Sequence, residues 1–121
     1  MIAAGCVVLP SLAIAEDVDL EAAKKQFVTS CGTCHVADDT GKHRQGPNLY
    51  QIFGAKSGQA VGFKYSAGLI AANLVYDAAT LDAWLENPKK IVAGTNMAYK
   101  QKDPAKRALV IAYLQSLAVK P

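Results

Sequence analysis

Cys31-Gly32-Thr33-Cys34-His35 is the stretch that decides the fold of this chain. Two cysteines separated by two residues and followed directly by a histidine form the attachment pattern of a c-type haem. On one helical turn, Cys31 and Cys34 point the same way, so each can form a thioether to one edge of a porphyrin. His35 then lies where an imidazole nitrogen can reach the iron. The motif therefore predicts a covalently bound haem with one histidine ligand.

The same motif is compatible with three kinds of site that hold no haem. A Cys-Gly-X-Cys pair also occurs in dithiol oxidoreductases, but there it follows a strand of a βαβ pattern, and this sequence has no such alternation. A zinc site needs two further ligands at suitable spacing, and only Cys6 and His43 remain. A structural disulfide is geometrically possible, but it gives no reason for a histidine directly after Cys34.

The composition is that of an ordinary single domain. The chain has 121 residues, of which 51% are apolar and 19% charged, and its formal net charge is +3. A nucleic-acid-binding domain is expected to have a pI above about 9 with clustered basic residues. This mild excess of positive charge therefore argues against a nucleic-acid partner. We also expect the protein to be a monomer.

Residues 1–15 form an uncharged apolar run that ends in the tripeptide AIA. Small residues at the last and third-from-last positions match a signal-peptidase site, although no Lys or Arg precedes the run. Either the true start lies upstream or the signal is a weak one. We expect cleavage after Ala15, export to the periplasm and a mature domain of residues 16–121 that begins at Glu16. Retention as a lipoprotein through Cys6 is the alternative.

The mature chain predicts helices and no strands. The first helix is expected over residues 19–33, with Asp19 as its N-cap and the haem motif at its C-terminal end. The last is expected over about 104–118, where Pro104 occupies the first turn. Two further helices are expected over residues 65–73 and 77–86.

Two long loops separate these helices. Residues 36–62 are rich in glycine and show no helical period, and a loop of this length either is disordered or wraps around something. Its apolar residues, such as Leu49 and Phe53, argue against disorder. The second irregular segment covers residues 89–102. A buried haem would give both loops a surface to pack on.

Met97 is the candidate for the second axial ligand, because Met1 is the only other methionine. A lone methionine is often a core residue, but this one lies in a loop, 62 residues after His35. His43 is the rival ligand. It lies only eight residues after His35, so we expect it to hydrogen-bond to the backbone instead.

Further motifs follow the haem motif in order: GPNL at 46–49, Tyr65-Ser66, WLENPKK at 84–90, GTNM at 94–97 and IAYL at 111–114. This ordered set, which spans residues 19–118, resembles class I cytochrome c, above all the mitochondrial protein and its soluble bacterial relatives. The resemblance implies an all-α cytochrome c fold. In that fold, four to five short helices and long loops wrap around one covalently bound haem c.

The resemblance also implies roles for particular residues. Thioethers would form at Cys31 and Cys34, and His35 and Met97 would be the axial ligands. The carbonyl of Pro47 would accept a hydrogen bond from the histidine ring. The other implied cofactor contacts are Tyr65 and Tyr76 at one propionate, Thr95 near the other, and Tyr99, in place of the usual phenylalanine, at the exposed haem edge.

The expected function is electron transfer and not catalysis. Methionine and histidine fill both axial positions of the iron and raise its potential, so one electron is shuttled between respiratory or photosynthetic partners as Fe2+ and Fe3+ interconvert. The alternatives are a haem peroxidase-like enzyme and the cytochrome subunit of a periplasmic dehydrogenase.

Charge is distributed unevenly along the chain. Acidic residues gather before and within the first helix, whereas lysines gather in the loops expected around the haem edge. Such a dipole predicts membrane or periplasmic partners with acidic docking surfaces. Candidates are a quinol–cytochrome c oxidoreductase, a terminal oxidase, a photosynthetic reaction centre or a dehydrogenase. The lysines concerned are Lys42, Lys56, Lys64, Lys89, Lys90, Lys100 and Lys102.

Overall fold

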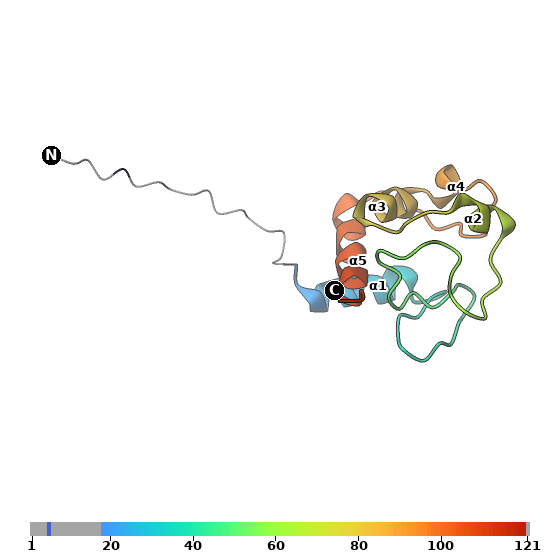
Figure 1. Cartoon of the computed structure of the whole chain (residues 1–121). Helices are drawn as coiled ribbons and strands as arrows, with labels where there is room; N and C mark the ends of the chain where they lie inside the picture. The colour runs from blue at the N-terminus through green and yellow to red at the C-terminus, as the bar shows by residue number, and fades with distance from the viewer. Residues whose placement is uncertain (1–4, 6–17, 121) are drawn as a thin grey trace.

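The computed structural model describes residues 5 and 18–120, and within them five helices are joined by long loops (Figure 1). The expected cleavage point between Ala15 and Glu16 lies outside the described residues, as does Cys6. The isolated bridge between Lys56 and Val75 is the β-type pairing found in the described part. The expectation of an all-α chain is confirmed. In the same part of the chain, no helix has the length and apolar character that crossing a bilayer requires.

Helix α1 (Leu20–Cys31) ends at the haem motif. The carboxylate of Asp19 accepts a backbone N–H of the first turn at 3.0 Å, so this residue is the expected N-cap. The helix ends two residues before the predicted boundary. Its last carbonyl, that of Cys31, accepts the N–H groups of Cys34 at 3.1 Å and of His35 at 2.9 Å. This tight turn carries the histidine out of the helix and toward the interior.

Helix α5 (Pro104–Ser116) crosses α1 at the end of the molecule where the described chain begins and ends (Figure 1). Ala23 of α1 is fully buried, and the two helices are in direct contact. The rings of Phe27 and Tyr113 lie 5.1 Å apart between their centroids. The first and last helices are therefore joined by an aromatic contact.

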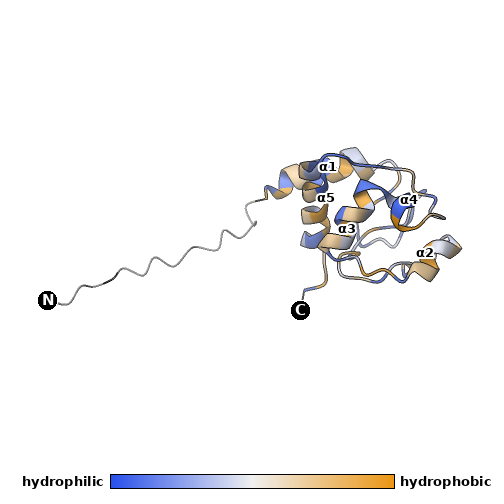
Figure 2. Ribbon diagram, turned by 90° about the horizontal axis from the view of Figure 1, so that it is seen from above, coloured by the Kyte–Doolittle hydropathy of each residue, from blue (hydrophilic) through white to orange (hydrophobic). Residues whose placement is uncertain are grey.

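The other helices lie together on the far side from α1. Helix α3 (Ala78–Glu86) packs against α5, and α2 (Ala67–Ala72) lies at the end opposite the α1–α5 pair (Figure 2). Helix α4 (Pro88–Ile91) corrects one prediction, because residues 89–102 are expected to be irregular throughout. Proline lacks an N–H and suits the first turn of a helix, so the Asn-Pro pair that ends α3 also begins α4.

The long loop after α1 is fixed by backbone pairing with the segment that precedes α3. Gly54 and Tyr76 are joined by an N–H to carbonyl bond of 2.8 Å, and the N–H of Tyr76 donates in turn to Ala55 at 2.9 Å. These bonds return the loop to the helical core. The buried apolar residues include Phe27, Leu81, Trp84, Leu85, Val110 and Leu114.

Candidate haem site

A cavity of about 600 Å³ lies inside the helical core, within the size range of cofactor pockets. It is bounded by the end of α1, the loop that follows it, helices α3 and α5, and the segment before α5. Much of its lining consists of core residues such as Leu81, Trp84 and Val110. The cavity brings together all nine residues that the sequence selects: Cys31, Cys34, His35, Pro47, Tyr65, Tyr76, Thr95, Met97 and Tyr99.

The imidazole of His35 is held in one orientation. Its Nδ1 lies 2.7 Å from the carbonyl oxygen of Pro47, and because a carbonyl can only accept, Nδ1 carries the proton. The lone pair is therefore on Nε2, the nitrogen that a metal would need. Burial lowers the pKa of His35, although the bond to Pro47 opposes part of this shift. The neutral ring that ligation requires is thus favoured.

Gly46 leaves room for that ring, and sequence reasoning did not select it as a site residue. A Cβ atom at this position would lie 2.7 Å from Nδ1 and 2.8 Å from Nε2 of His35, well inside van der Waals contact. The backbone is anchored here, since the N–H of Gly46 donates to the carbonyl of Cys34 at 2.8 Å. The Gly-Pro pair at residues 46–47 is the sequence signal that could have identified Gly46.

The two cysteines of the motif are free thiols at the end of α1. Burial, and to a lesser extent the nearby Cys34, raises the pKa of the Cys31 thiol to about 12. Dithiol oxidoreductases work with thiols whose pKa is lowered, so this environment argues against dithiol chemistry. The described residues also contain no cluster of three or more His, Cys, Asp or Glu side chains that could hold a metal ion.

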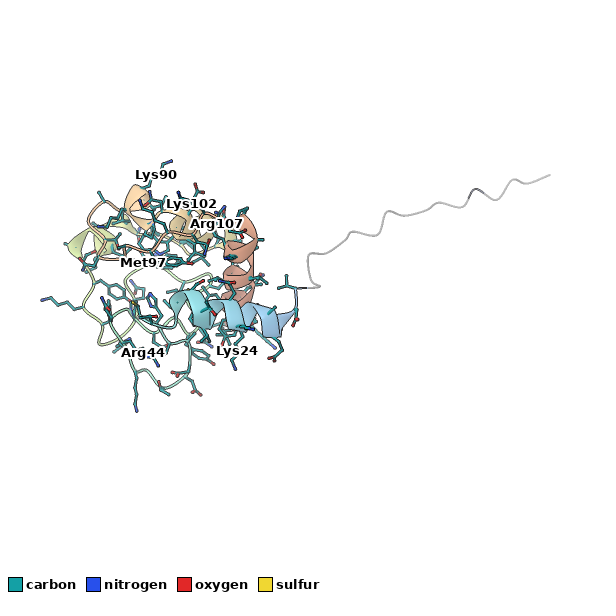
Figure 3. All side chains as sticks on the ribbon, turned by 180° about the vertical axis from the view of Figure 1, so that it is seen from behind. Lys24, Arg44, Lys90, Met97, Lys102 and Arg107 are labelled. Atoms are coloured by element: carbon teal, nitrogen blue, oxygen red, sulfur yellow. The ribbon has the colours of Figure 1, made fainter. Side chains whose placement is uncertain are left out.

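Met97 enters the cavity from residues 92–102, which we call the methionine-side loop. In Figure 3, Met97 lies between the layer of α3 and α4 and the layer of α1. Its N–H donates to the hydroxyl of Thr95 at 3.3 Å, and the N–H of Thr95 donates to the carbonyl of Val92 at 3.1 Å. On its other side, the hydroxyl of Tyr99 accepts a bond of 2.8 Å from the Gln101 side chain.

His43 has both ring nitrogens engaged away from the cavity. Nδ1 accepts the N–H of Asn48 at 3.0 Å, and Nε2 lies 2.7 Å from the carbonyl of Val61, to which it donates. The predicted bonding of this histidine to the backbone is confirmed. It joins two distant parts of the long loop and does not line the cavity with Met97.

Asn48 is the centre of a second cluster that sequence reasoning missed. Its amide nitrogen donates to the carbonyls of Asp38 at 2.9 Å and Lys42 at 3.1 Å, and its oxygen accepts the N–H of Tyr50 at 2.9 Å. Only 8% of this residue is exposed. It therefore fixes the fold of residues 36–49, which we call the histidine-side loop.

Two tyrosines line the cavity farther from the haem motif. The hydroxyl of Tyr65 accepts the N–H of Ala60 at 3.0 Å, which leaves its own proton available for donation. Burial raises the pKa of Tyr65, and it raises the pKa of Tyr76 to about 12. Both hydroxyls therefore stay protonated at neutral pH and can donate to an anionic group.

These features fit haem. The chain offers a large apolar cavity, a neutral imidazole whose lone pair is on Nε2, two thiols beside it and a thioether on another segment. Soft sulfur and imidazole are ligands that iron porphyrins accept in proteins. The tyrosine hydroxyls add donors for acidic substituents.

Comparisons with known proteins agree with this arrangement. The family model for cytochrome c matches residues 20–118. Over 98 residues the chain is 45% identical to cytochrome c of Chlamydomonas reinhardtii, a match that covers 80% of this chain and 88% of that protein. Over 95 residues it is 43% identical to cytochrome c2 of Rhodopila globiformis, covering 78% and 89%.

A solved structure gives the same result at the level of the fold. Cytochrome cH from Methylobacterium extorquens is 39% identical and superposes with a TM-score of 0.73, covering 81% of this chain and 98% of that one. The expected fold is confirmed, and the protein is an electron carrier that binds one covalently attached haem c. The chain belongs to the cytochrome c family, as a class I c-type cytochrome.

Proposed function

We propose that the cavity residues divide their roles between attachment and ligation. Cys31 and Cys34 form the two thioethers, and His35 and Met97 are the axial ligands. The observation that carries this proposal is that two segments 62 residues apart meet at one cavity. When bound, the haem supplies a reversible one-electron change between Fe2+ and Fe3+.

The chain orients the histidine ligand and keeps water away from the cofactor. The carbonyl of Pro47 holds the histidine ring and makes it a better ligand, as such partners do for metal-bound histidines. Tyr65, Tyr76 and Thr95 hold the propionates through their hydroxyl groups. Tyr99 covers the edge of the cofactor beside Met97.

Carrier function without catalysis follows from filled axial positions. With His35 and Met97 both holding the iron, no coordination site would be open for a substrate, and electrons would pass at the cofactor edge. Several exposed residues line the cavity where it reaches the surface, and electron exchange is proposed to occur there. They are Thr33, Gln45, Lys64, Asn96 and Ala98.

Spectroscopy of two variants tests the ligand assignment. The ferric wild-type protein should have the weak far-red absorption band of a methionine sulfur on haem iron and should bind cyanide slowly. Met97→Ala should lose the band and bind cyanide rapidly while keeping its covalent haem, whereas His43→Ala should retain the band. Rapid cyanide binding by the wild-type protein would contradict the assignment and favour a peroxidase-like enzyme.

The proposed partners are redox proteins with acidic docking surfaces in the periplasm. All seven lysines selected above are exposed, and none forms an ion pair within the described residues. Five lie in loops, and Lys89 and Lys90 lie on α4. Unpaired exposed lysines keep their full field for steering a partner. Lys64 lines the cavity itself, so at least one of them lies at the proposed transfer edge.

Paired substitutions test the steering. Lys90 and Lys24 lie on opposite sides of the molecule (Figure 3). Replacing Lys89 and Lys90 by alanine should slow association with a purified terminal oxidase about tenfold at low salt. Replacing Lys24 and Lys25 removes the same charge from the exposed side of α1 and should change the rate by less than about twofold. Equal rates for both pairs would show that net charge alone matters.

Export is proposed from the first 15 residues. Their apolar run and the AIA ending fit a cleaved signal peptide. N-terminal sequencing of protein from a periplasmic extract should begin at Glu16. A blocked N-terminus at Cys6 in the membrane fraction would instead indicate a lipoprotein.

A further inference from the structure

Arg107 is a buried cation that does not line the haem cavity. It lies on α5 at the position that continues the buried face of Val110 and Leu114, and it is 8% exposed. A guanidinium keeps its charge in proteins, and burying a charge is unfavourable unless hydrogen bonds and a counter-charge compensate. Its surroundings must therefore supply both.

The contacts of Arg107 come from two different segments. On α3, Asp82 accepts from Nε at 2.8 Å, and Glu86 lies 3.9 Å from Nη2. In the methionine-side loop, Nη1 donates to the carbonyls of Gln101 at 2.9 Å and Lys102 at 3.1 Å. One side chain therefore joins α5, α3 and the C-terminal end of that loop.

The same end of the loop has a second attachment to α3. The N–H of Gln101 donates to the carbonyl of Leu85 at 2.8 Å. Asp103, which caps α5, donates its own N–H to the side-chain oxygen of Gln101 at 3.1 Å. The backbone at Gln101 is thus held from both faces, four residues after Met97. Figure 3 shows Arg107 and Lys102 close together, with Met97 nearer the centre of the molecule in this view.

We propose that Arg107 is a positioning residue for electron transfer, which keeps the methionine-side loop closed over the cavity and so keeps Met97 in place. The inference rests on the proposed ligation by Met97. Breaking the two carbonyl contacts frees the segment from Gln101 back toward Met97, because α3 then holds it by one backbone bond alone. Without these contacts the loop would open more often, and an external ligand would reach the bound iron more easily.

The geometry requires arginine and not merely a positive charge. The planar guanidinium directs Nε to Asp82 while Nη1 reaches two carbonyls on another segment. Lysine carries its charge on one nitrogen and does not span these acceptors. Arg107→Lys therefore keeps the charge and removes the connection between segments, which separates positioning from simple charge pairing.

Imidazole binding to the ferric holoprotein tests this role, with amide hydrogen exchange as a second readout. Arg107→Lys should raise imidazole affinity and speed exchange of the Gln101 amide, each by about tenfold, the scale of one lost charge-assisted hydrogen bond. Glu86→Gln is the matched control on the same cluster, and its 3.9 Å contact predicts no change in either quantity.

A second control separates positioning from global stability. Tyr113→Leu weakens the contact of α5 with Phe27 without touching the cavity lining. It should lower the midpoint of denaturant unfolding yet leave imidazole affinity within about twofold of wild type. Wild-type affinity in Arg107→Lys, or equal rises in both variants, would overturn the role of Arg107. A wild-type protein without the methionine band would overturn ligation by Met97, and the inference with it.

Discussion

The histidine-side and methionine-side loops hold their proposed ligands in different ways. His35 follows α1 by one turn, and the residues beside its ring, Gly46 and Pro47, lie within 12 residues of it. Among the described residues, Met97 forms a hydrogen bond within its own loop to Thr95, and the loop is attached through Arg107 from a different helix. One ligand is thus held by short-range structure and the other by tertiary contacts.

This difference predicts which ligand is lost first. Tertiary contacts with few buried apolar groups open at lower free energy than local structure inside a packed core. We therefore expect the methionine-side loop to open before the rest of the molecule unfolds, with His35 still in place. Matched substitutions in the two loops test this difference.

Gly46→Ala should have the largest effect. Its new Cβ would overlap the ring of His35, so either the ring or the loop must move, at a cost of about 2–3 kcal/mol of unfolding free energy. Denaturant unfolding of the holoprotein measures this loss. Gly94→Ala is the control in the methionine-side loop, since a Cβ there meets nothing within 4 Å. Equal losses in the two variants would contradict the difference between the loops.

Asn48→Ala should have the next largest effect. It leaves the carbonyls of Asp38 and Lys42 and the N–H of Tyr50 without their present partner, which should lower the unfolding free energy by about 2 kcal/mol. Thermal unfolding followed by circular dichroism measures it. Asn96→Ala, at an exposed position of the other loop, should change stability by less than about 0.5 kcal/mol.

Much of the fold could be predicted from the sequence because its signals are local. Asp19, Ser66, Asp77 and Asp103 each cap the helix that follows, and each carboxylate or hydroxyl accepts an N–H of the first turn. Helix α4 was missed because its proline is equally a sign that α3 ends. Local signals of this kind do not distinguish the end of one helix from the start of the next.

Two buried polar residues outside the cavity that sequence reasoning missed, Arg107 and Asn48, depend on distant partners. Arg107 has the spacing of the buried face of α5, but arginine is rarely buried. Only its bond to Asp82, 25 residues away, and the carbonyls of the methionine-side loop explain its position. Asn48 is similar, because its partner Asp38 comes from ten residues earlier in an irregular loop. Spacing alone identifies neither residue.

Tyr99→Phe should have a smaller effect than Asn48→Ala. The variant loses one hydrogen bond, that from Gln101 at 2.8 Å, and water can replace the partner of the half-buried amide, so we expect a loss of about 1 kcal/mol or less. Imidazole binding to the ferric protein should rise slightly, which marks the change as one of loop closure. Tyr50→Phe, an exposed tyrosine of the long loop, should leave both quantities unchanged.

Asp38→Asn should have the smallest effect, and one that depends on pH. The side-chain hydroxyl of Thr40, and then its N–H, lower the pKa of Asp38, with a further contribution from Asn48. A carboxylate whose pKa is lowered by folding stabilises the folded state above its ordinary pKa near 3.8, and this contribution is lost as the pH falls through the lower folded value. The variant should therefore be slightly less stable than wild type at neutral pH and equally stable in strong acid.

Asp39→Asn is the matched control for that titration, because its carboxylate accepts no hydrogen bond among the described residues. Stability curves measured by denaturant from neutral pH into acid should converge for Asp38→Asn and wild type and run parallel for Asp39→Asn and wild type. Convergence for both variants would mean that acid acts on the loop through overall charge. Convergence for Asp38→Asn alone would locate the acid-sensitive contact within the histidine-side loop. Acid would then loosen the histidine-side loop and imidazole the methionine-side loop. This is the result expected if local contacts hold the first loop and tertiary contacts hold the second.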